Sequence, residues 1–201
     1  MSLKHCFLPQ MQRKGLNMGA VGYVIIIVVV IILMCLIWYV STMNSIRRLG
    51  LKCNEAASGI DVALTKRYDV LTKQLEVVKE YTSHEAKTLY ETIRLRSGMS
   101  IREKQEVLEQ MNNASEQFRL TAEAYPTLLS SETYKMLMAS ISDCEEHLQA
   151  ARRLYNANVN AYNTKIVMFP ASIVAGGIGA ISKELFVAEA HKRNDFEMKF
   201  H

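Results

Sequence analysis

The main feature of the hydrophobic pattern is one continuous apolar run near the N-terminus, residues 21–40, which reads VGYVIIIVVVIILMCLIWYV. No Asp, Glu, Lys, Arg or His occurs between residues 15 and 46. About 20 apolar residues in a helix, at roughly 1.5 Å each, cover a hydrocarbon core about 30 Å thick. Such a run is too long for an ordinary strand, and in lipid a helix satisfies its own backbone hydrogen bonds. The pattern therefore predicts a transmembrane helix over residues 18–41, preceded by a short tail, 1–17.

A cleaved signal peptide is the alternative interpretation of this run. The apolar region of a signal peptide is normally about 7–15 residues long and is followed by small residues at the cleavage site. Here the run is longer and ends in LIWYVSTMN. Tyr23 near one end, and Trp38 and Tyr39 near the other, are typical of the two membrane interfaces. We therefore expect an uncleaved anchor.

The charges that flank the run do not fix its orientation. Basic residues stand on both sides, Lys4, Arg13 and Lys14 before the run and Arg47, Arg48 and Lys52 after it. The positive excess that marks the cytoplasmic side is therefore nearly equal on the two sides. If translation starts at Met18 rather than Met1, the preceding charges are absent and the C-terminal part is expected to be cytoplasmic. Both starts stay open, and the second favours a cytoplasmic helical domain.

Beyond the run, residues that break helices are sparse, and Gly98, Pro126 and Pro170 divide the chain into three long segments. These segments are residues 43–96, 100–125 and 127–169. Their apolar residues recur at three- and four-residue steps, which predicts amphipathic helices, and short connections favour antiparallel neighbours. We therefore predict an all-α fold, in which the transmembrane helix is followed by an antiparallel three- to four-helix bundle with long helices over 42–170. A Gly/Ala-rich segment and a charged tail, 171–201, follow the bundle.

The first two segments carry narrow apolar stripes. The stripe of the first segment consists of Ile60, Leu64, Leu71, Leu75, Val78 and Tyr81. This helix is free to continue from the membrane run, with a kink near Gly50 or Gly59 as one option. The stripe of the second segment consists of Val107, Leu108, Met111, Phe118 and Leu120. The sequence MNNAS, 111–115, is a candidate interruption of the second helix.

The third segment has the most regular pattern. The sequence SSET places Ser130 or Ser131 at the N-cap, with Glu132 in the first turn. Six residues then follow at seven-residue spacing, namely Tyr134, Ile141, Leu148, Tyr155, Tyr162 and Phe169. Four residues after each of the first five come Met138, Glu145, Arg152, Val159 and Ile166. Because seven residues are close to two helical turns, this pattern predicts one face that packs on other helices.

Glu145 and Arg152 are charged residues within this apolar stripe. One interpretation is that they project outward from its edge. The other is a partly buried ion pair, with each other or with Arg67 and Asp69 of the first helix, that fixes the register of the helices.

Asn156 and Asn163 lie at the flank of the same stripe. They either bond side chains of a neighbouring helix or face water, and a structural role is favoured over a binding site. After the third helix, residues 171–183 are too short for a second span, and contact with the membrane surface or with the end of the bundle is expected. From Lys183 onward we expect a charged, helical tail.

The sequence offers little catalytic chemistry. It contains no HExxH, Walker A, GxSxG or Rossmann motif. His84-Glu85 and His147 are expected to be surface residues of helices, and a metal site built from them is the alternative. The four cysteines are scattered without a CxxC pair, which favours a reducing compartment. We expect no catalytic residue, no cofactor and no bound metal.

The charge balance excludes a nucleic-acid-binding class. The net charge is +4, and the basic residues that precede the span account for most of it. The part of the chain beyond the span is therefore nearly neutral and has no basic footprint.

Four runs, in order, resemble those of a known family. EAASGIDVALTKRYDVL (55–71) resembles the pattern E-A-x-x-x-I-D-V-x-L-x-x-R-x-D-L-I, and VVKEYTSHE (77–85) resembles V-K-x-Y-x-x-H-E. Tyr125-Pro126 resembles an E-x-Y-P turn. The run 145–170, EEHLQAARRLYNANVNAYNTKIVMFP, resembles E…R-x-x-Y-N-x-x-V-x-x-Y-N-x-x-I-x-x-F-P. These are runs of the LemA family, and the chain is also similar to its magnetosome-membrane branch, the MamQ-type proteins.

The resemblance implies an anchored, antiparallel helical domain without established catalytic residues. The residues that carry it are Asp61, Arg67, Asp69, His84, Glu85, Tyr125, Pro126, Glu145, Arg152, Tyr155, Asn156, Tyr162, Asn163, Phe169 and Pro170. The chain departs from the family at VLTKQL (70–75), which lacks the usual Pro and Asn, and at Ala57, where the family usually has Trp.

Three functional hypotheses follow. The first is a non-enzymatic membrane scaffold in a bacterial inner membrane, or in a magnetosome membrane as the branch implies. Its expected partners are the lipid bilayer, other membrane proteins and, as one option, further copies of itself, but not nucleic acid. The second is a membrane-linked signalling or sensory module, in which the first helix transmits changes. The third is a metal-dependent enzyme that uses His84, Glu85 and His147.

Overall fold

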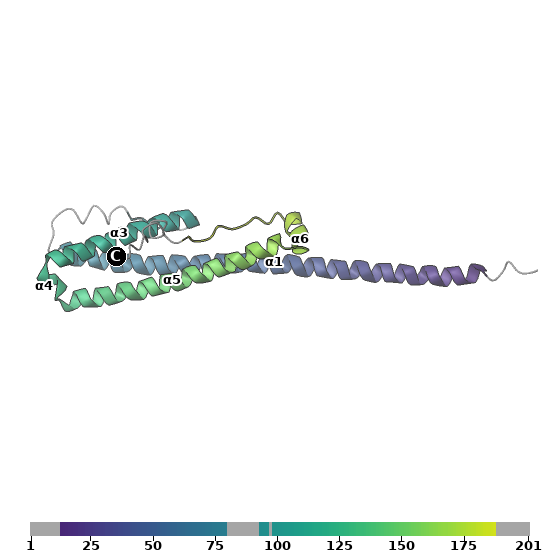
Figure 1. Cartoon of the computed structure of the whole chain (residues 1–201), viewed down its shortest axis with the longest axis horizontal. Helices are drawn as coiled ribbons and strands as arrows, with labels where there is room; N and C mark the ends of the chain where they lie inside the picture. The colour runs from purple at the N-terminus through teal and green to yellow at the C-terminus, as the bar shows by residue number, and fades with distance from the viewer. Residues whose placement is uncertain (1–12, 80–92, 97, 188–201) are drawn as a thin grey trace, which may run out of the picture. The chain divides into compact units, whose positions relative to one another are not determined.

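The computed structural model describes residues 13–79, 93–96 and 98–187 and contains only helices and irregular segments within them (Figure 1). The helices are α1 (Arg13–Lys79), α3 (Ile101–Ala124), α4 (Pro126–Leu129), α5 (Glu132–Val167) and α6 (Ala171–Gly177). The chain forms two compact units, Met1–Ser45 and Ile46–His201. The predicted all-α fold is confirmed.

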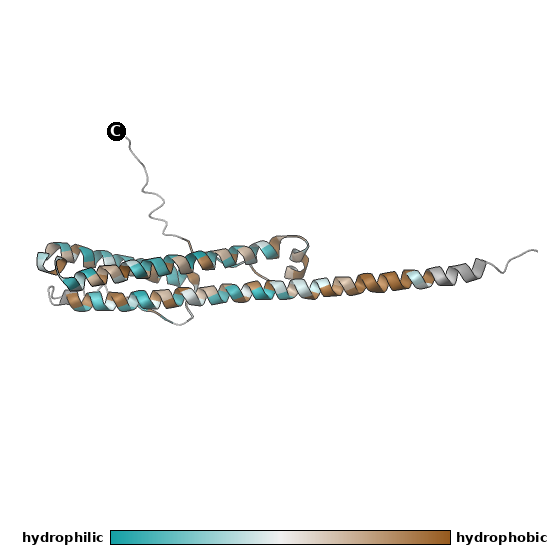
Figure 2. Cartoon of the chain, turned by 90° about the horizontal axis from the view of Figure 1, so that it is seen from below, coloured by the Kyte–Doolittle hydropathy of each residue, from teal (hydrophilic) through white to brown (hydrophobic). Residues whose placement is uncertain are grey.

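The first unit contains the apolar run, which lies within α1. Every side chain from Val21 to Val40 whose burial is described is exposed or nearly so, and none of the most apolar window of this helix is buried. Figure 2 shows this part of α1 largely in brown, the colour of hydrophobic residues. A helix of this length and composition is compatible with a single-pass membrane anchor. Among the described residues, α1 is the one helix with these properties.

The second unit is a bundle in which α5 runs antiparallel to α1. Three contacts establish the direction, because Asn158, Glu145 and Asp143 on α5 meet Lys52, Arg67 and Lys66 on α1, respectively. The helices α3 and α5 are connected through α4 and pack on each other where the rings of Phe118 and Tyr134 stack with centroids 5.6 Å apart. The helix α5 is therefore antiparallel to both of its long neighbours (Figure 1).

The core of the bundle contains most of the residues in the stripes predicted for α1 and α3 whose burial is described, although Leu75 is only half-buried, and Val78 and Tyr81 lie outside the residues whose burial is described. Ile60, Leu64 and Leu71 of α1 and Val107, Leu108, Met111 and Phe118 of α3 are buried. Leu120 is exposed, so its place in the stripe of α3 was wrongly predicted. The sequence MNNAS does not interrupt α3, because Met111 and Ala114 lie on its buried face.

The helices α3 and α5 begin at side-chain caps. Ser100 and Glu103 form a capping box, in which the Ser100 hydroxyl accepts from the Glu103 N–H and the Glu103 carboxylate accepts from the Ser100 N–H at 2.7 Å. Of the two predicted caps of α5, Ser131 is the one used, and its hydroxyl accepts from the Tyr134 N–H at 3.1 Å. These bonds satisfy backbone donors that have no partner within the helix.

The first helix was predicted to continue to Arg96, and this end is wrong. Residues 93–96 are irregular, and Ile93 is buried in the bundle. Gly98, with a φ of 79°, then turns the chain toward α3. This left-handed conformation costs little for glycine, which has no Cβ.

After α6 the chain returns along the bundle as an extended segment, residues 180–187, which we call the strap. It was predicted to become helical at Lys183, but residues 183–187 are not helical. The strap is held by side-chain bonds from other elements, and these bonds compete with helix formation.

Candidate functional site

A ladder of side-chain bonds joins α5 to the strap. The Asn163 Nδ2 donates to the Lys183 carbonyl at 2.8 Å, and the Lys183 N–H donates to the Asn163 Oδ1 at 2.9 Å. Asn156 repeats this arrangement with Phe186, at 2.8 Å for both bonds. Each amide therefore pairs with one backbone unit through a donor and an acceptor, as a neighbouring strand would.

The spacing of the two asparagines follows from geometry. Seven residues of α-helix advance about 10.5 Å, and three residues of extended chain advance about 10 Å. Asn156 and Asn163 are seven residues apart on the helix, and their partners Phe186 and Lys183 are three residues apart on the strap. Helix and strap therefore stay in register over both pairs, running in opposite directions.

Aromatic residues of the same run complete the ladder. The Tyr155 hydroxyl, on a buried side chain, donates to the Glu184 carbonyl at 2.9 Å. Burial, together with the neighbouring Cys53 and Glu184, raises the pKa of Tyr155, so this hydroxyl stays a donor at neutral pH. The Arg152 guanidinium lies 4.8 Å from the centre of the Phe186 ring, a cation–π distance.

The strap also contacts α1 and α3. The Lys183 Nζ donates to the Asn54 Oδ1 at 3.0 Å. Arg102 forms an ion pair with Glu184 at 2.8 Å, and the Gln105 side chain donates to the Val187 carbonyl at 3.1 Å. The strap therefore connects all three long helices of the bundle.

Neither predicted environment of Asn156 and Asn163 is the observed one, because both bond the backbone of a non-helical segment. Lys183 and Phe186 were not predicted as their partners, and Glu184 was not predicted as the partner of Tyr155. Two asparagines at i and i+7 on a helix were the only signal, since the strap has no periodic pattern of its own.

Two further ion pairs, besides that of Lys66 with Asp143, connect α1 to its neighbours. The Lys104 Nζ lies 2.7 Å from the Asp61 carboxylate and also donates to the Ala57 carbonyl at 3.3 Å, with only 5% of the Lys104 side chain exposed. The Arg67 Nη2 lies 3.3 Å from the Glu145 carboxylate. Of the environments predicted for Glu145, the observed one is the ion pair with Arg67.

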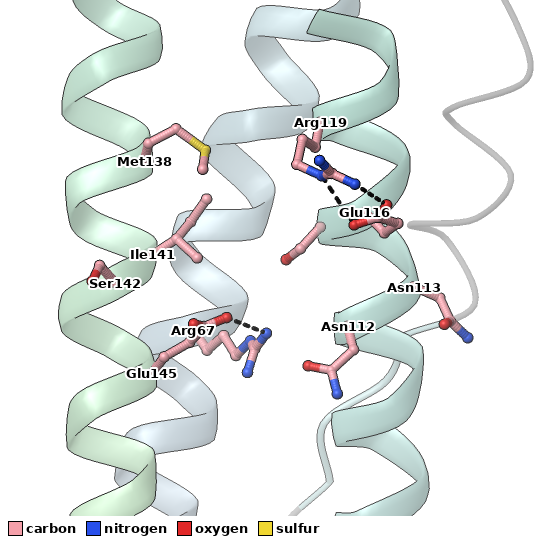
Figure 3. A pocket seen from close by; sticks show the side chains of 10 residues that line it. Arg67, Asn112, Asn113, Glu116, Arg119, Met138, Ile141, Ser142 and Glu145 are labelled. Atoms are coloured by element: carbon pink, nitrogen blue, oxygen red, sulfur yellow. Dashed lines mark hydrogen bonds and ion pairs between the residues drawn. The ribbon is translucent and has the colours of Figure 1, made fainter. Parts of the chain in front are cut away.

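A cleft of about 590 Å³ opens between α1, α3 and α5 beside this pair (Figure 3). Arg67 and Glu145 lie on one side, and Asn112 and Arg119 of α3 lie on the other. Arg119 is already paired with Glu116 and Glu123. The charged groups of the cleft are therefore paired with one another, and its lining residues in the described part of the chain include no Cys, His or Lys.

The remaining residues that carry the family resemblance lie in different parts of the fold. Tyr125 ends α3, and Pro126 begins α4, where a proline costs no helical hydrogen bond. Asp69 is exposed, and Tyr162 is buried. His84 and Glu85 lie outside the described residues.

Phe169 and Pro170 lie in the corner between α5 and α6, and both are exposed. Phe169 is 80% exposed, so its predicted place in the packing stripe is wrong. The physical reason is that α5 ends at Val167, and the heptad spacing has no meaning beyond the helix.

The described residues hold no group of three or more His, Cys, Asp or Glu that could bind a metal. His147 is exposed and lies 3.4 Å from Asp143. Cys53 and Cys144 are buried, and this burial raises the pKa of both thiols, which disfavours the reactive thiolate.

Comparison with known proteins shows the family of the chain. The LemA family model matches residues 56–200. Protein LemA of Metamycoplasma hominis is 27% identical over 164 residues, covering 79% of this chain and 75% of the relative. Magnetosome protein MamQ 2 of Paramagnetospirillum magneticum is 34% identical over 74 residues, covering 37% of this chain and 27% of the relative. MamQ of Magnetospirillum gryphiswaldense is 35% identical over 63 residues, covering 31% and 23%. The chain belongs to the LemA family.

Proposed function

We propose that this protein is a non-enzymatic scaffold, anchored in a bacterial inner membrane by residues 18–41, whose helical domain binds other membrane proteins on the cytoplasmic side. The observation that carries the proposal is the unburied apolar part of α1, next in the chain to a bundle. An apolar stretch of this length without buried residues fits a lipid environment, whereas the bundle keeps a solvent-exposed polar surface.

The use of the polar residues supports a structural role for the bundle. Asn156, Asn163 and Tyr155 hold the strap, and Asp61 and Glu145 hold neighbouring helices together. An acid–base or nucleophilic site would instead need reactive groups that converge on an open position.

Recovery of partner complexes from native membranes tests the scaffold role. Full-length protein, crosslinked in the cell and then purified, is expected to bring down defined membrane proteins in fixed ratio. A control protein reduced to residues 1–45 should reach the membrane without these partners. A chain that stays alone, while a single substitution such as Glu145→Gln abolishes its activity without unfolding it, would indicate an enzyme instead.

We further propose that the protein acts in the formation of magnetosome membranes, and its similarity to the MamQ proteins supports this role. That similarity covers about a quarter of those relatives. Deletion of the gene in its own host, followed by electron cryotomography, is expected to remove the intracellular membrane compartments. A host that has no such compartments, or keeps them after deletion, contradicts the magnetosome role and leaves the scaffold role standing.

A further inference from the structure

The corner between α5 and the strap exposes large apolar side chains that the bundle does not use. Its members, which we call the apolar corner, are Val167, Met168, Phe169, Ile173 and Ile181, each between 59% and 80% exposed. The opposite face of α6 packs normally, because Ala171, Val174 and Ala175 are buried. Apolar groups concentrated at one exposed place commonly mark an interaction surface.

The sequence around the apolar corner is uncharged over a long stretch. No charged residue occurs between Lys165 and Lys183, so exposed Phe and Ile side chains are bounded on both sides by a lysine. Arg47 and Arg48, at the start of the bundle part of α1, are also exposed. Apolar side chains with basic residues around them are the composition of segments that lie in the interface of anionic membranes.

Chain connectivity limits how far the bundle can lie from a membrane that holds the apolar run. A methyl group placed on Gly50 would meet the Tyr162 ring at 3.7 Å, so the end of α5 lies beside this part of α1. Because α5 is antiparallel to α1, the residues after Tyr162 advance toward Ile46. Residues 41–45 separate Ile46 from Val40, the last residue of the apolar run. Even when fully extended, this connection spans at most about 20 Å.

We infer that the apolar corner inserts into the interfacial layer of the bilayer that holds the anchor, and that anionic phospholipid is its partner. The insertion explains why Phe169, a residue of the family resemblance, is exposed rather than packed. Lys165 and Lys183 then lie at the level of the phosphate groups, while Phe169 and Ile173 reach the acyl-chain boundary. The inference rests on the proposed anchoring and adds a second membrane contact to it.

Tryptophan quenching by brominated lipid tests this contact in the full-length protein. Trp38 is the only tryptophan, so a Trp38→Phe chain carrying Phe169→Trp reports from the apolar corner alone. The protein is reconstituted in vesicles of equimolar phosphatidylcholine and phosphatidylglycerol, with or without bromine on the acyl chains. Met136→Trp in the same background is the matched control, because Met136 is a similarly exposed apolar residue of α5. Unsubstituted Trp38 is read separately to verify the anchor.

We expect Phe169→Trp to be quenched several-fold more strongly than Met136→Trp, and more strongly than in vesicles of phosphatidylcholine alone. Equal quenching at the two positions, with Trp38 strongly quenched, would overturn the inference while the anchor stands. A blue-shifted emission that depends on protein concentration but not on bromine would overturn it in favour of contact with a second copy. Ile173→Trp repeats the measurement on α6 and should give the same result.

Discussion

At the scale of single residues, the side chains of Asn156 and Asn163 supply the backbone hydrogen bonds that a neighbouring strand would otherwise give to the strap. An extended segment leaves its N–H and C=O groups without partners unless another element supplies them. Here two amides supply four bonds to Lys183 and Phe186. Aspartate or serine in the same places could not offer a donor and an acceptor in one plane, which gives the repeated asparagine a physical reason.

Asn163→Ala is therefore expected to release the strap. The substitution removes two hydrogen bonds of a half-buried group and should lower the free energy of unfolding by about 1–3 kcal/mol. Hydrogen exchange at the Lys183 N–H should become faster, while the Phe186 N–H keeps part of its protection. Asn160→Ala, at an exposed position of the same helix, is the control and should change neither quantity. Unchanged exchange at Lys183 in the Asn163 variant would mean that the ladder does not hold the strap.

The two ends of the YN…YN…FP run should respond differently to truncation. Tyr162 is 7% exposed and Phe169 80% exposed. Tyr162→Ala is expected to cost about 3–5 kcal/mol, as for other buried aromatic residues, whereas Phe169→Ala should change stability by less than about 0.5 kcal/mol. Thermal unfolding of the detergent-solubilised protein, followed by circular dichroism, measures both. A large loss for Phe169→Ala would place its ring in a packed contact.

At the scale of the elements, the sequence pattern was sufficient to locate α3, α5 and the faces that they bury. The heptad residues Leu148, Tyr155 and Tyr162 are buried as predicted, but Leu137 and Cys144 were missed. The reason is the mismatch between 3.6 and 3.5 residues per turn. In the first half of α5, the buried residues Leu137 and Cys144 lie three residues after a heptad position. In the second half, the buried residues Val159 and Ile166 lie four residues after one.

The strap and the end of α1 could not be obtained in the same way. Helix patterns arise from the burial of one face, whereas the strap is positioned by bonds from Asn156, Asn163 and Tyr155 on another element. Its own sequence, AISKELFV, reads equally well as a helix. The ion-pair partners of Asp61 and Glu145 were likewise not predictable with certainty, because they depend on how the helices pack against one another.

The contact between Lys66 of α1 and Asp143 of α5 predicts a pH dependence. The hydrogen bond from Lys66, together with the charges of Lys66 and His147, lowers the pKa of Asp143, and the same bond raises the pKa of Lys66. The carboxylate therefore contributes stability above its unfolded pKa of about 3.9, and this contribution is lost as the pH falls through the lower folded value. The lysine contributes stability below about pH 10.4, which is lost as the pH rises through the higher folded value.

The wild type should accordingly melt at a higher temperature than Asp143→Asn between roughly pH 5 and pH 9, and the difference should shrink toward both extremes. Because both side chains are about half exposed, the effect should be small and should weaken in high salt. Asp69→Asn, at an exposed position of α1, is the control. A difference that does not vary with pH would assign the effect of Asp143→Asn to something other than charge.

A double-mutant cycle tests whether Arg67 and Glu145 act together. The Arg67 side chain is 7% exposed and that of Glu145 is 51% exposed, so solvent screens one side of the pair. We expect Glu145→Gln to cost about 0.5–1 kcal/mol in the wild type and close to nothing in an Arg67→Met background. Glu146→Gln, at the exposed neighbouring position, should be neutral in both. Strictly additive free energies of unfolding would remove the proposed role of the pair in fixing the register of α1 and α5.

At the scale of the whole molecule, the anchor and the bundle were both readable from the sequence, but the side of the membrane was not. Length and apolarity alone identify a span, whereas orientation depends on a difference between flanking charges that is nearly zero here. The buried state of Cys53 and Cys144 also matters, because it removes the two natural thiols of the bundle as reporters of topology.

An introduced cysteine can decide the orientation of the bundle. Ala150 is exposed on α5, so Ala150→Cys, with Cys6 and Cys35 replaced by serine, presents one accessible thiol. Cys53 and Cys144 should stay unlabelled in the folded protein, because burial shields them and raises the pKa of both thiols. For a cytoplasmic bundle, a membrane-impermeant maleimide should label Ala150→Cys in inside-out vesicles but not in intact cells with a permeabilised outer membrane. The parent chain without Ala150→Cys shows that no buried thiol contributes. Labelling in intact cells would place the bundle, and with it the binding surface of the proposed scaffold, on the outer side.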